Sequence, residues 1–186
     1  MKRNIIVAKK ALSPILCNEI IELGKNQLHK GGVGKGDVNK KIRNSEICFF
    51  NGSLTYFNLY KPILELVQHV NNEFYNFNII EPETFQLTRY HEKNQGFYKP
   101  HEDGFYEDKP NVLVRKLSMS AQLTSPEYYE GGQLEFPDDK DSFIEEDAKE
   151  QGTVVFFPSY LKHGVRPVTK GIRHSLVSWF VGPSFR

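Results

Sequence analysis

The sequence is poor in the features that mark secreted, membrane-spanning and nucleic-acid-binding proteins. Only two cysteines occur among its 186 residues, Cys17 and Cys48, and they fit neither a disulfide framework nor a metal-binding cysteine pair. We therefore expect free thiols in a reducing compartment. Lysine and arginine number 24 against 23 aspartate and glutamate residues. This balance gives no excess charge that would favour nucleic acid or an anionic membrane surface.

Long apolar runs are missing as well. No window approaches the roughly 18 apolar residues of a membrane helix. The basic N-terminus, MKRNIIVAKKALS, lacks the apolar stretch of a signal peptide. These absences predict a cytoplasmic protein with neither a membrane nor a nucleic acid as partner. What the sequence does contain is 39% hydrophobic residues and 13% aromatics, a composition that suits one folded domain and favours β-structure.

Residues 1–81 are predicted to be a helical and strand support for the rest of the chain. Ser13 can cap a helix that begins at Pro14 and extends to about Leu28. A second amphipathic helix is predicted from Tyr60 to Tyr75. Its apolar face would be formed by Ile63, Leu64, Val67, Val70 and Phe74.

Residues 30–43 separate the predicted helices and are expected to be a flexible, glycine-rich loop. Four glycines fall within six residues there, but no strand precedes them, so a phosphate-binding loop is excluded. Lys40, Lys41 and Arg43 are expected to be solvated. The end of this segment, IRNSEICFF, is predicted to be a strand.

Residues 82–186 alternate short β-rich runs with turn signals. The runs are TFQLTRY, GFYKPH, NVLVRKLSMSAQL, GGQLEF, DSFIE, TVVFFP, HGVRPV and RHSLVSWFV. Many short strands of this kind indicate a sandwich or barrel. The predicted fold is mainly β with flanking α-helices, in one domain that spans residues 1–186.

Three side chains are candidate metal ligands. In a strand, residues two apart point to one face, so His101 and Asp103 can aim a nitrogen and an oxygen at a common point. His163 is the best-placed third ligand, because it follows the buried-looking run TVVFFP. Two histidines and one carboxylate leave positions open on a non-haem iron. The alternative is that His-x-Asp is a chance tripeptide.

Arg173 is the second chemical feature. Strand alternation places Arg173, Ser175, Val177 and Trp179 on one face of a mostly apolar strand. A guanidinium buried there is costly unless an anion meets it, and its planar fork suits a carboxylate. The alternative is an internal ion pair with an aspartate or glutamate.

Taken together, these motifs resemble the iron(II)/2-oxoglutarate-dependent dioxygenases of the prolyl 4-hydroxylase-like (PKHD-type hydroxylase) family. The resemblance is carried by RYHEKNQGFYKPHED, LSMSAQLTSPEYYEGGQLEF and FPSYLKHGVRPVTKGIRHSLVSWFVGP, which occur in the family's order. It implies a double-stranded β-helix (a jelly-roll, cupin-like core) over residues 82–186. It also implies that His101, Asp103 and His163 hold Fe(II) and that Arg173 binds the distal carboxylate of 2-oxoglutarate.

The resemblance further implies which residues surround the co-substrate and the substrate. Ser175 would assist Arg173, and the co-substrate pocket would be lined by Tyr90, Gln122, Leu134, Val165 and Trp179. Ordinary core packing is an equal alternative for Leu134 and Val165. Tyr98 and Arg43 are candidate substrate contacts. The loop from Gly31 to Arg43 would be a lid, as family members often have there.

The implied reaction is hydroxylation of an unactivated C–H bond, with release of succinate and CO2 and with ascorbate as reductant. A prolyl residue in a peptide or protein is the first expectation for the substrate. A free amino acid or small molecule is the alternative, and a non-catalytic binding module on the same fold is an alternative of another class. Nucleic-acid demethylases of this superfamily carry a second arginine six residues after the first, where this chain has Trp179.

Overall fold

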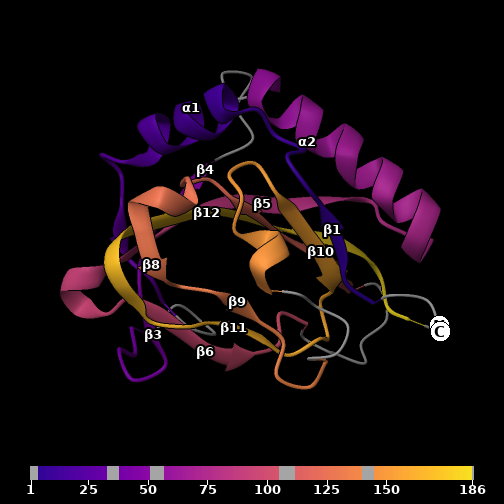
Figure 1. Cartoon of the computed structure of the whole chain (residues 1–186). Coiled ribbons are helices and arrows are strands. Elements are labelled where there is room, and N and C mark those ends of the chain that lie inside the picture. The colour runs from indigo at the N-terminus through magenta and orange to yellow at the C-terminus, as the bar shows by residue number, and fades with distance from the viewer. Residues whose placement is uncertain (1–3, 33–37, 51–56, 105–111, 140–144, 186) are drawn as a thin grey trace.

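The computed structural model describes residues 4–32, 38–50, 57–104, 112–139 and 145–185. They form two antiparallel sheets, and two helices lie on the outer face of the larger sheet (Figure 1). In spatial order, the larger sheet contains β1 (Ile6–Ala8), β10 (Val154–Pro158), β7 (Leu113–Gln122), β12 (Val168–Pro183), β5 (Glu81–His91), β4 (Glu46–Phe50) and β2 (His29–Lys30), and β8 (Tyr129–Gly131) pairs with β12. The smaller sheet contains β3 (Arg43–Asn44), β6 (Phe97–His101), β11 (His163–Val165) and β9 (Leu134–Glu135). The predicted β-sandwich with flanking helices is confirmed.

One predicted strand proves to be two. The run IRNSEICFF divides at Ser45, so that β3 pairs with β6 in the smaller sheet and β4 pairs with β5 in the larger sheet. The predicted strand DSFIE is residues 141–145, of which 141–144 lie outside the described part of the chain, and its last residue begins a short 3-10 helix, Glu145–Ala148. Residues 33–37 of the predicted flexible loop are also outside it.

The first helix, α1 (Pro14–Gly24), begins as predicted, with the Ser13 hydroxyl accepting a hydrogen bond from the backbone N–H of Leu16 at 3.2 Å. It ends four residues before the predicted end at Leu28. At Gly24 the chain passes so close to β5 that an added Cβ would lie 2.5 Å from the Leu87 side chain. The following residues turn and enter β2.

The second helix, α2 (Phe57–Val70), continues into a π-helical turn at Asn71–Tyr75. A π turn holds more residues than an α turn and therefore rotates the next side chains around the axis. The predicted inward-facing Phe74 is 45% exposed, whereas the Tyr75 hydroxyl lies 2.9 Å from the carbonyl oxygen of Phe156. Two further 3-10 turns occur at Glu92–Asn94 and Pro126–Tyr128.

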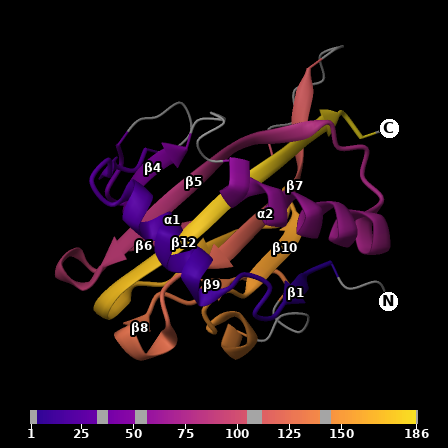
Figure 2. The ribbon, with the colours of Figure 1, turned by 90° about the horizontal axis from the view of Figure 1, so that it is seen from above.

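The two faces of the larger sheet differ in chemistry. Toward the helices, β7 and β12 present apolar side chains that pack with α1 and α2, which cross that face (Figure 2). These are Leu117, Met119 and Ala121 of β7 and Leu176 and Phe180 of β12. Toward the smaller sheet, the alternate positions carry Ser118, Ser120 and Gln122 of β7 and Arg173, Ser175 and Trp179 of β12. The site therefore lies between the sheets.

Both cysteines are buried free thiols, as predicted. Within the described ranges, the structure contains no helix long and apolar enough to cross a membrane.

Candidate metal centre and adjoining cavity

Strand pairing brings the two candidate histidines together. His101 ends β6 and His163 begins β11, and the two residues are direct partners across the antiparallel pair. Their ring centroids lie 4.4 Å apart. The Nδ1 atom of His101 lies 2.9 Å from the carbonyl oxygen of Lys99, and that of His163 lies 3.0 Å from the carbonyl oxygen of Leu161. An Nδ1–H that donates to a carbonyl leaves Nε2 free to bind a metal.

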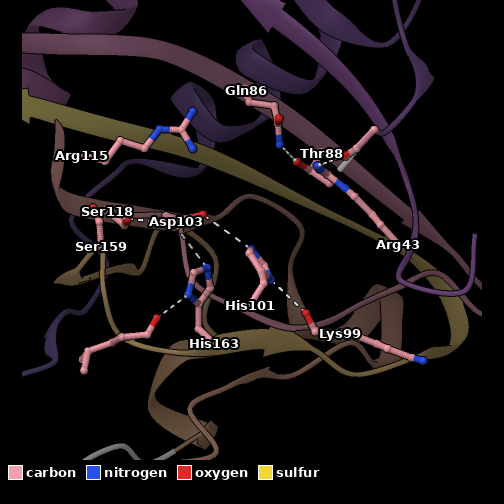
Figure 3. A network of polar contacts seen from close by, with 12 residues as sticks. Arg43, Gln86, Thr88, Lys99, His101, Asp103, Arg115, Ser118, Ser159 and His163 are labelled. Carbon is pink, nitrogen blue, oxygen red and sulfur yellow. Dashed lines mark hydrogen bonds and ion pairs between the residues drawn. The ribbon is translucent and has the colours of Figure 1, made fainter. Parts of the chain in front are cut away.

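Asp103 completes the group from a position beyond the end of β6 (Figure 3). Its backbone N–H donates to the carbonyl oxygen of Ser159 at 2.9 Å, and its Oδ2 accepts a hydrogen bond from the Ser118 hydroxyl at 2.8 Å. Nε2 of His101 lies 3.5 Å from Oδ1, and Nε2 of His163 lies 3.4 Å from Oδ2. One ligand atom from each of the three residues lies within 4.8 Å of the others, so the group could hold a metal ion.

This geometry changes the reason why Asp103 lies beside His101. Strand alternation predicts that His101 and Asp103 share a face, but Asp103 lies outside the strand. Its position is fixed instead by hydrogen bonds to two serines, Ser118 on β7 of the larger sheet and Ser159 just after β10. The hydroxyls of these serines lie 2.9 Å apart.

The protonation states suit metal binding. Burial opposes ionisation of Asp103, but the positive field of His163, the hydrogen bond and charge of His101, and the Ser118 hydrogen bond outweigh it and hold the pKa of this carboxyl well below its usual range. Burial lowers the pKa of His163, despite the opposing effect of Asp103. A carboxylate and a neutral imidazole are the forms that bind metals.

Arg173 lies buried in the same inter-sheet space, with 4% of its surface exposed. Its Nε donates to Oε1 of Gln122 at 2.9 Å, and its guanidinium carbon lies 5.6 Å from the centre of the Tyr90 ring. Its Nη1 is buried without a hydrogen-bond partner. Arg173 forms no ion pair with any aspartate or glutamate in the described ranges, which contradicts the alternative of an internal ion pair.

A cavity of about 470 Å³ extends from the metal ligands over the inner face of the larger sheet. It is lined by His101, Asp103 and His163 and by five of the residues predicted around the co-substrate, namely Tyr90, Leu134, Val165, Ser175 and Trp179. Gln122 and Arg173 line a small adjoining space, to which Ser120 and Leu134 also belong. The structure thus gathers every predicted site residue around two neighbouring spaces.

Comparison with known proteins now decides the family. Residues 85–181 match the profile of the 2OG-Fe(II) oxygenase superfamily, and this segment is more than half of the chain. The chain belongs to this superfamily. A PKHD-type hydroxylase of Synechococcus sp. (strain JA-2-3B'a(2-13)) is 32% identical over 84 residues, which cover 42% of this chain and 34% of that relative. The match thus spans about a third of the relative's length.

Solved structures show the same fold as this chain. The viral collagen prolyl hydroxylase of Paramecium bursaria Chlorella virus-1, in its 2OG complex, aligns with a TM-score of 0.74 at 21% identity and covers 97% of both chains. A Trichoplax adhaerens prolyl hydroxylase, in complex with a hypoxia inducible factor peptide fragment, aligns with a TM-score of 0.73 at 16% identity, covering 96% of this chain and 83% of that chain. The double-stranded β-helix core expected from the sequence is thereby confirmed.

The structure corrects the expectation for one basic residue. The sequence predicts that Arg43 is solvated, but only 6% of its surface is exposed. Its Nε donates to the Ser45 hydroxyl at 2.7 Å and its Nη1 donates to the carbonyl oxygen of Gly32 at 3.2 Å. Its guanidinium carbon lies 4.6 Å from the centre of the Tyr98 ring. Lys40 and Lys41 are exposed, as predicted.

Two further features of the cavity were not predicted. Arg115 of β7 places its guanidinium carbon 4.0 Å from the centre of the Trp179 ring and forms a two-bond ion pair with Glu83, at 2.5 and 2.7 Å. The indole Nε1 of Trp179 is buried without a hydrogen-bond partner. The second feature is the support that Ser118 and Ser159 give to Asp103. Alternation along β7 places Ser118 on the face of Gln122, but no sequence pattern shows that this face meets a loop after β6.

Proposed function

We propose that this chain is a 2-oxoglutarate-dependent non-haem iron dioxygenase that hydroxylates a prolyl residue in a peptide or protein and releases succinate and CO2. The observation that carries this proposal is the pairing of a two-histidine, one-carboxylate group with a buried guanidinium that lacks an anionic partner, in adjoining spaces. Either feature alone is compatible with a purely structural role. Together they suit a metal ion and a dicarboxylate that reaches from the metal to Arg173.

The chain's residues fit both groups. Two imidazole Nε2 atoms and one carboxylate suit Fe(II), because they leave open positions for further ligands. The unpaired Nη1 of Arg173 is a buried donor that needs an acceptor, and a carboxylate oxygen provides one. Bound iron and 2-oxoglutarate would together supply the activation of dioxygen.

Each neighbouring residue has a positioning role in this proposal. Gln122 orients the Arg173 guanidinium through its Oε1, and its own amide is fixed by a 2.7 Å hydrogen bond to the carbonyl oxygen of Thr124. Ser175, one alternation along β12 from Arg173, offers a hydroxyl to the same carboxylate. Tyr90, Leu134 and Val165 bound the cavity and exclude water from the co-substrate.

The opposite end of the cavity suits the substrate. Trp179 lies six residues beyond Arg173 on β12, or about 20 Å along an extended strand, so its indole cannot contact the carboxylate that Arg173 binds. Its unpaired Nε1 is instead available to an oxygen of the substrate. The names of the two solved relatives, both prolyl hydroxylases and one in complex with a peptide, support a peptidyl proline.

We also propose that residues 1–81 and 82–186 fold as one domain. Cys17, Ile20 and Ile63 of the two helices share a single apolar cluster with Leu87 and Leu117 of the larger sheet. Removal of either helix would therefore expose the outer face of that sheet to water.

The direct test is turnover of Fe(II)-loaded protein with 2-oxoglutarate, ascorbate as reductant, and a library of proline-containing peptides. We expect succinate formation coupled to the gain of one oxygen atom by a peptide, measured by mass spectrometry. His101→Ala is the inactive control. Coupled turnover with free amino acids alone would show that the substrate is a free amino acid and not a peptidyl proline. Stoichiometric 2-oxoglutarate binding without any turnover would indicate a binding module.

A further inference from the structure

We propose that a second groove, beside the cavity, binds an acidic segment of the peptide substrate. This inference rests on the proposed function and extends it to the class of peptide. The groove has a volume of about 480 Å³ and is called here the basic groove. Its charged lining consists of Lys30, Lys40, Arg43, Arg89, Lys93 and a single carboxylate, Glu46.

The positive charge of the basic groove is not neutralised by the described residues around it. Glu46 is already engaged, because its Oε2 lies 2.8 Å from Nε and 2.7 Å from Nη2 of Arg89. Lys30, Lys40 and Lys93 are exposed and form no ion pair with a described residue. The whole chain carries a formal net charge of only +1. The groove is therefore a local concentration of cations on a nearly neutral molecule.

Arg43 makes the basic groove continuous with the cavity, since its side chain lines both. Its guanidinium carbon lies 4.6 Å from the ring centre of Tyr98, which in turn stacks on the metal-site residue His101 at 3.6 Å between ring centres. Two ring contacts thus separate the metal centre from the groove. An extended peptide advances about 3.3–3.6 Å per residue. A residue about three positions from the hydroxylated one would therefore reach the groove.

The lining favours a peptide over other anions. Phenylalanine, tyrosine and tryptophan do not occur among the lining residues in the described ranges, so the groove lacks the stacking surfaces that single-stranded nucleic acids use. Asn44 and Asn94 also line the groove, where they hydrogen bond to each other, and the Ser45 hydroxyl, which accepts from Arg43, can still donate to a peptide carbonyl. Lysines on edge strands can also serve to prevent sheet pairing. That role fits Lys30 on β2, but Lys40 and Lys93 lie outside strands.

The test measures binding of labelled peptides to protein loaded with Mn(II) and 2-oxoglutarate, by fluorescence anisotropy. Four peptides share one central proline: the flank is either Asp-Glu-Asp or Asn-Gln-Asn, and each flank is placed on either the N-terminal or the C-terminal side. We expect one acidic peptide to bind about tenfold more tightly than its neutral partner, a factor typical of several exposed charge pairs. The difference should disappear at about 0.5 M salt, where such pairs are screened.

Two triple variants change the net charge of the protein by the same amount, at different places on its surface. In Lys30→Glu/Lys40→Glu/Lys93→Glu, the preference for the acidic peptide should vanish. In a control triple at Lys10, Lys25 and Lys61, which are exposed near or on the helices, it should persist. Far-UV circular dichroism and the Tm should be unchanged in both triples, which shows that the protein is folded.

The outcomes separate this inference from the proposed function. Equal binding of all peptides, no binding of any, or a preference that survives the groove triple would overturn the basic groove as a peptide site. So would an oligonucleotide of equal charge that competes as well as the acidic peptide. Whether the neutral peptide gains oxygen is a separate measurement. A groove-dependent preference without hydroxylation of any peptide would refute the hydroxylase and retain the groove.

Discussion

The replacement of Arg173 by methionine should have opposite effects on the apoprotein and on the 2-oxoglutarate complex. In the apoprotein, the buried Nη1 has no partner, and such a donor costs about 1–3 kcal/mol. Methionine removes that cost. It also leaves Oε1 of Gln122 without its bond from Nε, and this loss lowers the free energy of unfolding by about 1 kcal/mol. The free energy of unfolding should therefore stay the same or rise by up to about 2 kcal/mol.

In the complex, the same substitution removes the charged partner of a buried carboxylate. Loss of one partner of such a pair costs about 2–5 kcal/mol, so the affinity for 2-oxoglutarate should fall by about 30-fold or more. A ligand at 100 times its Kd raises the free energy of unfolding by about 2.7 kcal/mol. For a chain of this length, that corresponds to an increase in Tm of about 5–10 °C in the wild type, and at most about a third of it should remain in Arg173→Met at the same concentration.

The assay is thermal unfolding in Mn(II), with 2-oxoglutarate and with 2-oxobutyrate, a keto acid that lacks the distal carboxylate. The wild type and Arg173→Met should respond equally to 2-oxobutyrate, because both retain the metal centre. If the variant is less stable than the wild type without ligand, or retains the full Tm increase with 2-oxoglutarate, Arg173 is a structural residue and the assignment of the carboxylate site is wrong.

Three further predictions concern the metal, the substrate and pH. Ser118→Ala should weaken metal binding by about tenfold, measured by titration calorimetry, because it frees Asp103 to rotate; Ser178→Ala, a matched change on the helix side of the sheet, should not. Trp179→Phe should raise the peptide KM about fivefold, the effect of one lost hydrogen bond, while the 2-oxoglutarate KM stays constant; a rise in the latter alone would place the indole at the co-substrate. Burial and then nearby cations lower the pKa of His174 from 6.5 to about 4, so stability is complete above pH 6.5 and falls as the pH drops from there toward 4. Denaturant unfolding of metal-free protein should show a loss to which His174 contributes about 3 kcal/mol over that range and to which the lowered pKa of His163 adds, and His174→Gln should reduce the loss by about 3 kcal/mol.

The sequence predicts the candidate site better than it predicts the elements that surround the site. Strand alternation is a local rule, and it correctly places Arg173, Ser175 and Trp179 on one face of β12. The pairing of His101 with His163 depends on two strands more than 60 residues apart. The position of His163 after TVVFFP and the family resemblance both name the residue, but no local pattern predicts that these two strands pair.

Asp103 shows how residues that do lie together can be named for an incorrect reason. The i, i+2 rule requires both residues to be in one strand, whereas β6 ends at His101. The backbone of Ser159 and the hydroxyl of Ser118 replace the strand in directing the carboxylate. Ser118 lies on the other sheet and Ser159 directly follows one of its strands, so their contact with Asp103 exists only once the sheets have packed. Sequence reasoning therefore missed these supports although it named the candidate ligand.

Arg43 marks the limit of local reasoning most clearly. A basic residue in the polar stretch KKIRN is expected to be solvated, and a single strand through IRNSEICFF would have kept it on one sheet. The chain instead leaves the smaller sheet at Asn44 and enters the larger sheet at Glu46, so the residues on either side of Ser45 line the space where the sheets meet. A long cationic side chain at that crossing is buried by Tyr98 and bonded by Ser45 and Gly32. The burial of Arg43 is therefore a consequence of the change of sheet, and the same change gives it access to both the cavity and the basic groove.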